Sequence, residues 1–406
     1  MTSVRSLLAI AAAKQWPLLQ MDVKNAFLNG TLSGEVYMKP PPSTTPPPQK
    51  VCLLRRALYG LKQAPRAWFA TFSSTITQLG FTSSSHDSAL FTRQTSNGDD
   101  PQAISYLQYY MGQHFEIKDL GNLNYFLGLE ISSSPGGYYL SQEKYASDLL
   151  NRSSITDFAT ISTPLDPNVR LTPFDGVPLD DPTLYRQLVG NLIYLTVTCP
   201  DIAYAVHIVS QFMAAPCTIH FTVVLRIILY IRGTLGHGLQ FSSQFSMVLS
   251  GFSDADWAGD PTDRRSTTGY CFYQGDALIF WRSKKQSVVS RSSTESEYRA
   301  LVDAISKLLW LRWLLTNMGA PQTSPIILHC DNRSAIQIAH NDVFHERTKH
   351  IENDCHFVRH HLQSNTLHLK SISTTNQPAD IFTKALHSPH FTHLIHKLKV
   401  VSTLLT

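Results

Sequence analysis

Four acidic residues in the C-terminal half of the sequence each follow an expected strand or begin an expected helix. They are Asp254, Glu297, Asp331 and Asp380. Carboxylates can bind two Mg²⁺ ions about 4 Å apart, which activate an attacking water and stabilise the leaving oxygen. Taken alone, each of these residues is better explained as a helix cap. Four of them in this arrangement predict a two-metal hydrolase, in which the role of the neighbouring Asp256 stays open.

Asp22 ends an apolar segment that begins at Leu18, and an aromatic residue, Phe27, follows five positions later. An aspartate at a strand end can bind a divalent cation if another carboxylate converges on it, and otherwise it caps a turn. Farther along, five basic residues are interleaved with Tyr59, Trp68 and other aromatic residues. This composition favours a surface that contacts phosphates and stacks on bases, with a solvated basic helix face as the alternative. The five basic residues are Lys50, Arg55, Arg56, Lys62 and Arg66.

The composition limits the classes of protein to consider. The chain has 406 residues, of which 43% are hydrophobic and 16% charged, and its formal net charge is +4. Those values predict two or three folded domains, and they exclude a disordered chain and a wholly basic nucleic-acid coat. Six cysteines without a Cys-x-x-Cys pair exclude a disulfide scaffold and a zinc ribbon. They also indicate a reduced, intracellular protein, cytoplasmic or nuclear.

Two further patterns are assigned to structure rather than to function. The apolar run Val4–Ala13 is too short to cross a bilayer, which takes about 20 residues, and a buried helix is expected there rather than a secretion signal. No other stretch of the sequence qualifies as a membrane span. Several histidines near Cys355 lack the spacing of a structural zinc site, so no zinc is expected. They are His345, His350, His356, His360 and His361.

The elements that must position the candidate residues follow from prolines and periodicity. Proline-rich stretches at 40–48 and 162–182 predict loops, while helices are expected over 184–213 and 223–231. A hairpin is expected with its turn at 132–137. From about Met247 to His387 strands and helices alternate, which predicts an α/β domain. Its elements are expected to include a long helix around 297–318 with Trp313 in the core, a strand at 326–330 and a last helix near 379–386.

Several sequence blocks together are specific to one family. They are the Asp22 segment with LYGLKQAPRAW, then DLGNLNYFLGLEI, YRQLVGNLIYLTVTCPDIAYAV and SDADWAG. With these blocks the chain resembles, nearly end to end, the reverse transcriptase and ribonuclease H of copia-type LTR retrotransposons. The resemblance implies that Asp22 is the first metal-binding carboxylate of the polymerase palm and that Phe27 excludes ribonucleotides. It also implies that Gly60 and Gln63 belong to the element that holds nucleotide and template, and that 125–130 is the primer grip.

In the C-terminal half, the resemblance implies that the four carboxylates are the metal ligands of a ribonuclease H, which uses Mg²⁺ or Mn²⁺. Its partner would be an RNA–DNA hybrid, with an RNA template and a DNA primer by family and no membrane. No equivalent of the mobile catalytic histidine of many cellular ribonucleases H is found in 371–377. Basic residues around Trp281 are expected to follow the hybrid backbone, unless they are salt-bridged or merely solvated. They include Arg282, Lys284 and Lys285.

Two departures from the family pattern affect the polymerase half. The family has a Tyr-Val-Asp-Asp hairpin between a strand near 91–92 and a helix near 105–111, and here roughly a dozen residues are missing. Asp99 and Asp100 are interpreted as residues that follow the lost hairpin. The family's fingers precede the segment that begins here at Met1, so Met1 is expected to be internal to a longer frame. The polymerase is therefore expected to be inactive.

These observations predict an α/β and α+β multidomain fold. The expected regions are a partial reverse-transcriptase palm (1–131), a helical thumb or connection (132–245), a ribonuclease H-like domain (246–390) and a C-terminal tail (391–406). The expected function is cleavage of RNA in RNA–DNA hybrids by two-metal catalysis. One alternative is a non-catalytic relic, favoured by Cys199 and Cys217 at positions where similar elements usually carry arginine. Another is an intact element whose hairpin was omitted when the gene was delimited.

Overall fold

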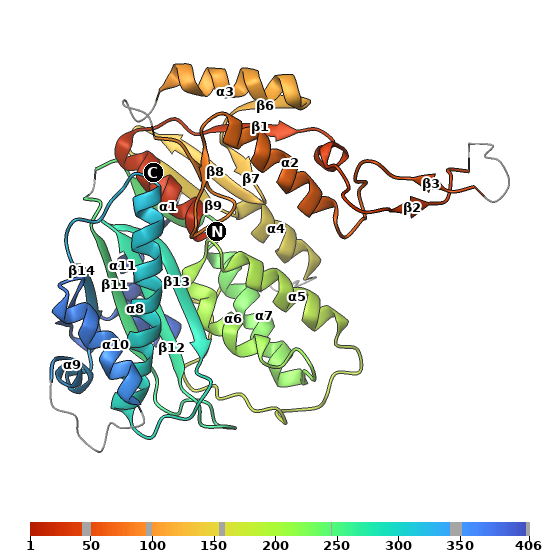
Figure 1. Cartoon of the computed structure of the whole chain (residues 1–406). Coiled ribbons are helices and arrows are strands. Elements are labelled where there is room, and N and C mark those ends of the chain that lie inside the picture. The colour runs from red at the N-terminus through yellow and green to blue at the C-terminus, as the bar shows by residue number, and fades with distance from the viewer. Residues whose placement is uncertain (43–49, 95–99, 154–158, 245, 342–350, 403–406) are drawn as a thin grey trace. The chain divides into compact units, whose positions relative to one another are not determined.

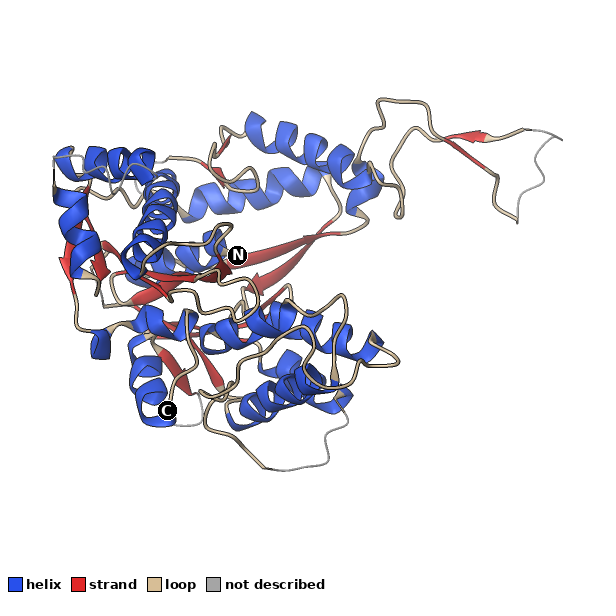
Figure 2. Cartoon of the chain, turned by 90° about the horizontal axis from the view of Figure 1, so that it is seen from below, coloured by secondary structure: helices blue, strands red, loops and turns tan. Residues whose placement is uncertain are grey.

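In the computed structural model of the chain, the described residues are 1–42, 50–94, 100–153, 159–244, 246–341 and 351–402. Packing groups the chain into two units, one formed by Met1–Trp16 with Asn124–Thr406 and the other by Pro17–Leu123. Each unit contains both helices and strands, and the colours of Figure 2 show the mixture over the whole chain. The mixed α/β class is therefore confirmed. The four expected regions follow the family resemblance rather than packing, and their boundaries stay a prediction.

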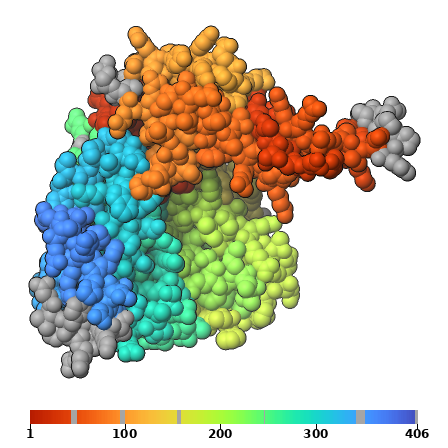
Figure 3. Space-filling view, viewed as in Figure 1, coloured from red at the N-terminus to blue at the C-terminus, as the bar shows by residue number. Residues whose placement is uncertain are grey.

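The unit Pro17–Leu123 consists of short strands and two longer helices. In chain order these are β1 (Leu19–Val23), η1 (Ala26–Asn29), β2 (Tyr37–Met38), β3 (Cys52–Leu53), α2 (Ala64–Gln78), β4 (Thr82–Ser83), β5 (Phe91–Thr92), α3 (Pro101–His114) and β6 (Ile117–Asn122). The strands pair antiparallel as β1–β6, β2–β3 and β4–β5. Figures 1 and 3 show the β2–β3 hairpin extending away from α2 as an arm.

The second unit contains an antiparallel sheet with several helices around it. Its elements are α1 (Thr2–Lys14), β7 (Tyr125–Phe126), β8 (Leu129–Ser134), β9 (Gly137–Ser141), α4 (Glu143–Arg152), α5 (Thr183–Leu195), η2 (Pro200–Ile202), α6 (Ala203–Ser210), α7 (Thr218–Gly233), β10 (His237–Ser242), α11 (Ser388–Lys397) and β16 (Val400–Ser402). The strand order is β16-β10-β9-β8-β7. The helix α1 confirms the buried helix expected at the N-terminal end, since residues 8–12 are nearly inaccessible.

The expected hairpin is confirmed by the pairing of β8 with β9, but its turn is shorter than the expected 132–137, because residues 132–134 and Gly137 are paired in the strands. Gly137 follows its turn with a φ of 125°, a conformation that side chains with a Cβ rarely adopt. A Cβ at this position would lie 1.9 Å from the carbonyl oxygen of Phe241 on β10. Glycine is therefore required both by the backbone conformation and by the close approach of the next strand.

The same unit holds the sheet that carries the four acidic residues. Its elements are β11 (Leu249–Ala255), β12 (Thr267–Gln274), β13 (Ala277–Lys285), α8 (Ser293–Asn317), β14 (Ile326–Cys330), α9 (Arg333–His340), α10 (Glu352–Gln363), β15 (Leu367–Ser371), η4 (Thr374–Asn376) and η5 (Pro378–Phe382). The order is β13-β12-β11-β14-β15. The strand β11 pairs antiparallel with β12 and parallel with β14, and β14 pairs parallel with β15. The helix α8 packs on β11 and β12.

Three expectations about the helices of the chain are corrected. The helical run 184–213 is interrupted between α5 and α6, because Pro200 lacks the amide hydrogen that a continuous helix needs. The last expected helix is instead the five-residue 3₁₀ helix η5, whose residues are all buried, so it lacks the solvated face of a longer surface helix. Trp313 is 52% exposed, since it lies on the opposite side of α8 from the buried Leu311 and Leu315.

Folded structure continues beyond the ribonuclease H-like region expected from the sequence. The helix α11 spans Ser388–Lys397 and β16 pairs with β10, so residues up to 402 belong to packed elements. Within the described ranges, none of the helices has the length and the apolar character needed to cross a bilayer.

Candidate active site

The sheet topology brings the four acidic residues together. The strands β11 and β14 run parallel side by side, so the carboxyl-terminal ends of both lie at one edge of the sheet. Asp254 lies near that end of β11, and Asp331 immediately follows β14. Glu297 is on the second turn of α8, which packs on β11, and Asp380 is in η5, which packs on β11 and β12.

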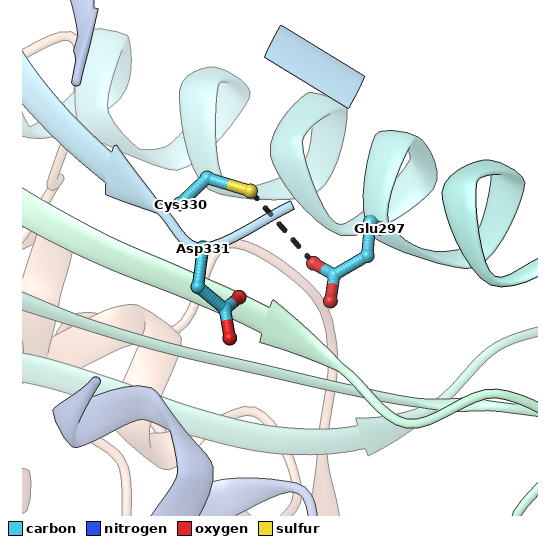
Figure 4. Close-up of side chains that lie close together, drawn as sticks. All are labelled: Glu297, Cys330 and Asp331. Atoms are coloured by element: carbon cyan, nitrogen blue, oxygen red, sulfur yellow. Dashed lines mark hydrogen bonds between the residues drawn. The ribbon is translucent and has the colours of Figure 1, made fainter. Parts of the chain in front are cut away.

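Oxygen atoms of Asp254, Asp331 and Asp380 lie within 4.8 Å of one another. A second group, Glu297, Cys330 and Asp331, meets the same limit and shares Asp331 with the first. Figure 4 shows the second group, with Glu297 reaching from α8 toward the end of β14. Asp254 and Asp380 are each only 2% exposed and Glu297 is 6% exposed. The structure thus brings together all four carboxylates predicted for this site.

Burial changes the protonation of the cluster. It raises the pKa of Glu297 well above the ordinary value, and the charges of Asp254 and Asp331 add to the effect. Burial, with a contribution from Asp254, also raises the pKa of Asp380 to about 8. Several carboxylates that share one buried site cannot all ionise unless a cation compensates their charges.

The donor set suits a divalent metal ion. One buried oxygen of Asp331, Oδ1, has no hydrogen-bond partner among the described residues, and its other oxygen accepts a hydrogen bond of 2.7 Å from Thr374 Oγ1. Small hard cations such as Mg²⁺ prefer carboxylate oxygens. Asp254, Glu297, Asp331 and Asp380 therefore fit the metal that the resemblance implies.

A lysine and a threonine that the sequence motifs did not indicate also contact the cluster. The ammonium nitrogen of Lys384 lies 3.0 Å from Asp380 Oδ1 and 3.5 Å from Asp254 Oδ2. Thr383 donates a hydrogen bond from Oγ1 to Asp254. Lys384 follows Asp380 at the i, i+4 spacing of helical ion pairs, which is the one signal in the sequence that could have indicated it.

A histidine also lies near the cluster, although outside the stretch where one was sought. His390 Nε2 on α11 lies 4.0 Å from Asp380 Oδ2. Burial, followed by the charges of His393 and Lys384, lowers the pKa of His390. A neutral ring is therefore favoured at this position near neutral pH.

Asp256 has a different environment from the four carboxylates. It accepts a hydrogen bond from the backbone amide of Thr267, and burial raises its pKa to about 7. It belongs to neither acidic group in the described part of the chain. It lines a cleft of about 470 Å³ together with Trp257, Arg264 and Lys384. Asp256 therefore belongs to the wall of the cleft rather than to the cluster.

The basic residues of β13 fall into two classes. Lys285 forms ion pairs with Asp260 at 2.6 Å and Asp263 at 2.8 Å, which is the salt-bridged alternative. Arg282 is half-buried and Lys284 is exposed, and these two form the second class.

Trp281 is buried, with the Arg5 guanidinium 3.7 Å from its ring centre. It therefore packs in the interior and does not offer a base-stacking surface.

The polymerase-type residues lie in the other unit. Asp22 is exposed on β1 and pairs with Lys118 on β6. The centres of the Phe27 and Tyr59 rings lie 4.7 Å apart. Gly60 has a φ of 91°, Gln63 precedes α2, and the five basic side chains are exposed, namely Lys50, Arg55, Arg56, Lys62 and Arg66.

Among the described residues, Asp22 does not form a group of three ligand side chains of the kind that the four carboxylates form. Asp22 belongs to neither acidic group found in those ranges. Asp100 caps α3, where its side chain accepts from the amides of Gln102 and Ala103. Asp99 lies outside the described residues, as do His345 and His350 of the rejected zinc pattern.

Sequence relatives agree with the resemblance. A family model for reverse transcriptase (RNA-dependent DNA polymerase) matches residues 1–167. The chain is 42% identical, over 98% of its length, to the retrovirus-related Pol polyprotein from transposon RE1 of Arabidopsis thaliana, and spans 28% of that protein. It is 35% identical to the Pol polyprotein from transposon TNT 1-94 of Nicotiana tabacum, over 95% of this chain and 31% of that one. A transposon Ty5-1 protein of Saccharomyces cerevisiae is 32% identical over its full length and 71% of this chain.

Solved structures give weaker likenesses. The foamy viral protease-reverse transcriptase in complex with RNA/DNA hybrid aligns with a TM-score of 0.48 at 11% identity, over 91% of this chain and 45% of that one. LC11-RNase H1 aligns with a TM-score of 0.27 at 15% identity, over 34% of this chain and 93% of that one. Structural likenesses this weak do not decide the family. The family follows instead from the identity and coverage of the sequence relatives. The chain belongs to the copia-type, retrovirus-related Pol polyproteins of transposons.

Proposed function

We propose that the chain binds RNA–DNA hybrids and cleaves their RNA strand at the carboxylate cluster of Asp254, Glu297, Asp331 and Asp380. The observation that carries the proposal is the convergence of oxygens from β11, η5 and the residue after β14 to within 4.8 Å of one another. The two groups share Asp331, which is the arrangement that two neighbouring ions need. The proposal concerns the part of the polyprotein that this chain spans.

The residues of the site have separate tasks in this proposal. The four carboxylates bind divalent ions, which would supply Lewis acidity and an activated water. Hydrogen bonds from Thr383 and Thr374 fix the carboxylates of Asp254 and Asp331, respectively. The low exposure of the cluster strengthens each of these electrostatic interactions.

The cleft next to the cluster supports binding of a nucleic-acid strand. Arg170 and Arg264, both exposed, line it, so phosphate groups would find positive charge there. Trp257 is 54% exposed and its indole nitrogen donates to the carbonyl of Ser290 at 3.1 Å, which fixes an aromatic surface at the cleft. Basic and aromatic side chains together are typical of nucleic-acid contacts.

We propose further that the unit with Asp22 does not extend primers. Polymerase chemistry needs several carboxylates around its ions, because one alone cannot hold two of them. Asp22 is exposed and pairs with a strand that carries Lys118 opposite it. In the described residues Asp22 is part of neither acidic group.

The test of the proposed function is cleavage by the full chain of a hybrid with labelled RNA in Mg²⁺ or Mn²⁺. The expected result is RNA cleavage that EDTA abolishes, with double-stranded DNA left intact, because recognition depends partly on the 2′-hydroxyls. A folded, monodisperse chain that cleaves no hybrid with either metal would instead support the non-catalytic alternative.

A further inference from the structure

The carboxylate cluster contains a cation of its own. Lys384 contacts acids from two separate elements, Asp254 on β11 at 3.5 Å and Asp380 in η5 at 3.0 Å. Its backbone amide donates to the carbonyl of Asp380 at 3.1 Å, so the turn after η5 holds the lysine beside the cluster. The ammonium group thus touches two of the three residues whose oxygens form the first acidic group.

We infer that the ammonium group of Lys384 occupies one cation position of the cluster, so that a divalent ion binds there only by displacing it. This inference rests on the proposed function, since it concerns the metal affinity of the same site. Lysine carries a compact charge and three hydrogen-bond donors, and it can satisfy the same oxygens that a metal ion would use. A dication placed against Asp254 and Asp380 would meet like charge at contact distance.

The two acidic groups differ in this respect. In the second group, Glu297 and Asp331 accept hydrogen bonds from neutral donors. Cys330 Sγ lies 3.9 Å from Glu297 Oε2, and Thr374 donates to Asp331. Among the described residues, the ion-pair contacts of Lys384 are with Asp254 and Asp380, whereas its charge acts on Glu297 and Asp331 only from a longer distance. A first ion can therefore bind at Glu297 and Asp331 without removing a cation, whereas a second ion at Asp254 and Asp380 competes with Lys384.

The lysine has space into which to move. Its side chain is 39% exposed, in contrast to the 2% of Asp254 and Asp380. It lines the cleft that also holds Trp257 and Arg264. The long flexible stem allows the ammonium group to turn from the carboxylates into this cleft. Once displaced, Lys384 would add positive charge where the phosphates of a bound strand are expected.

Binding of Mn²⁺ to the full chain tests the inference directly. Free Mn²⁺ is titrated by electron paramagnetic resonance against the parent chain and Lys384→Met, which keeps the length of the side chain and removes its charge. The parent should bind one ion more tightly than the second. In Lys384→Met, affinity for the second ion should rise by about tenfold, because about one unit of like charge is removed from contact with the ion.

Two further variants separate competition from other effects. Lys384→Arg keeps the positive charge and should retain the weak second site of the parent. Lys399→Met removes a lysine that pairs with Asp276 at 3.6 Å instead of with the cluster, and it should leave both affinities unchanged. A larger Mn²⁺-induced rise in melting temperature for Lys384→Met than for the parent is also expected, because the metal then replaces a missing cation.

The outcomes distinguish this inference from the proposed function. If the parent binds Mn²⁺ and Lys384→Met binds it with unchanged or lower affinity, the competition is wrong while the metal site stands. If neither protein binds Mn²⁺, the metal site and the competition are both wrong. If only the variant binds a second ion measurably, the inference is supported in its strongest form.

Discussion

Thr383 donates a hydrogen bond from its hydroxyl to the carboxylate of Asp254, although 129 residues separate the two in sequence. Both side chains are almost fully buried. The same hydroxyl lies 3.3 Å from the carbonyl oxygen of Asp380. One small side chain therefore joins two of the proposed metal-binding segments and fixes the orientation of an acid that can rotate about its own side-chain bonds.

Replacing that hydroxyl should weaken both the fold and the site. Thr383→Val keeps the shape of the side chain but removes one hydrogen-bond donor from the buried carboxylate of Asp254. The free energy of unfolding should fall by about 1.5–3 kcal/mol, as for other hydrogen bonds to charged groups. Mn²⁺ affinity should fall as well. Thermal unfolding and metal titration check this, with Thr316→Val on the exposed surface of α8 as the matched control. Equal losses in the two variants would remove the special role of Thr383.

Stability without metal should depend on pH through Asp380. Its pKa is raised by burial and by Asp254 to about 8, so the folded chain binds this proton more tightly than the unfolded chain does. The stabilising contribution is therefore present below about pH 4 and is lost as the pH rises through about 8.

Asp380→Asn should remove this dependence because the amide stays neutral. In EDTA, the melting temperature of the variant should rise relative to that of the parent between about pH 5 and about pH 8. Thermal unfolding at a series of pH values measures the difference. A difference that does not change with pH would contradict the raised pKa.

The basic residues of β13 should respond differently to substitution. Arg282→Ala and Lys284→Ala should each flatten the dependence of log affinity for a hybrid on log salt by about one unit, as expected for a lost phosphate contact. Lys285→Ala should leave the slope unchanged and lower the melting temperature, because Asp260 and Asp263 lose the ammonium group that pairs with both of them. Fluorescence anisotropy at several salt concentrations tests this division. A slope near zero in the parent would show that none of the three contacts phosphate.

Primer extension should be absent. On a poly(rA) template with an oligo(dT) primer, the full chain should add no nucleotides, because Asp22 belongs to neither group of clustered ligand residues in the described ranges and one carboxylate cannot hold two ions. Gel analysis of extension products measures this. Extension that disappears in Asp22→Ala would contradict the account and show that another residue completes the site.

The elements of the α/β sheet were largely predictable from the sequence. The strand at 326–330 and the long helix that contains Glu297 have strong local patterns, and the structure has both. The convergence of the acids followed from the family resemblance, and the parallel pairing of β11 with β14 supplies its physical cause. The hairpin before Gly137 was predictable because turn residues separate two apolar strands.

The contacts made by Thr383 and Lys384 were not predictable in this way. They depend on how the turn after η5 lies against β11, and no periodic pattern in the sequence encodes that placement. The same limit applies to Lys285, whose partners Asp260 and Asp263 lie more than twenty residues earlier. For Trp313 the reason is different: a bulky aromatic at approximate helical spacing predicts a core position, but the residue lies on the exposed side of α8.

The central claim is that the four carboxylates form a metal-dependent ribonuclease site. The most direct measurement is hybrid cleavage by the full chain carrying Asp254→Asn or Asp331→Asn, with Asp303→Asn on the exposed side of α8 as control. Loss of a metal ligand should lower the cleavage rate by about a hundredfold or more without lowering the melting temperature, and the control should cleave as the parent does. Cleavage at the parental rate by both ligand variants would contradict the account.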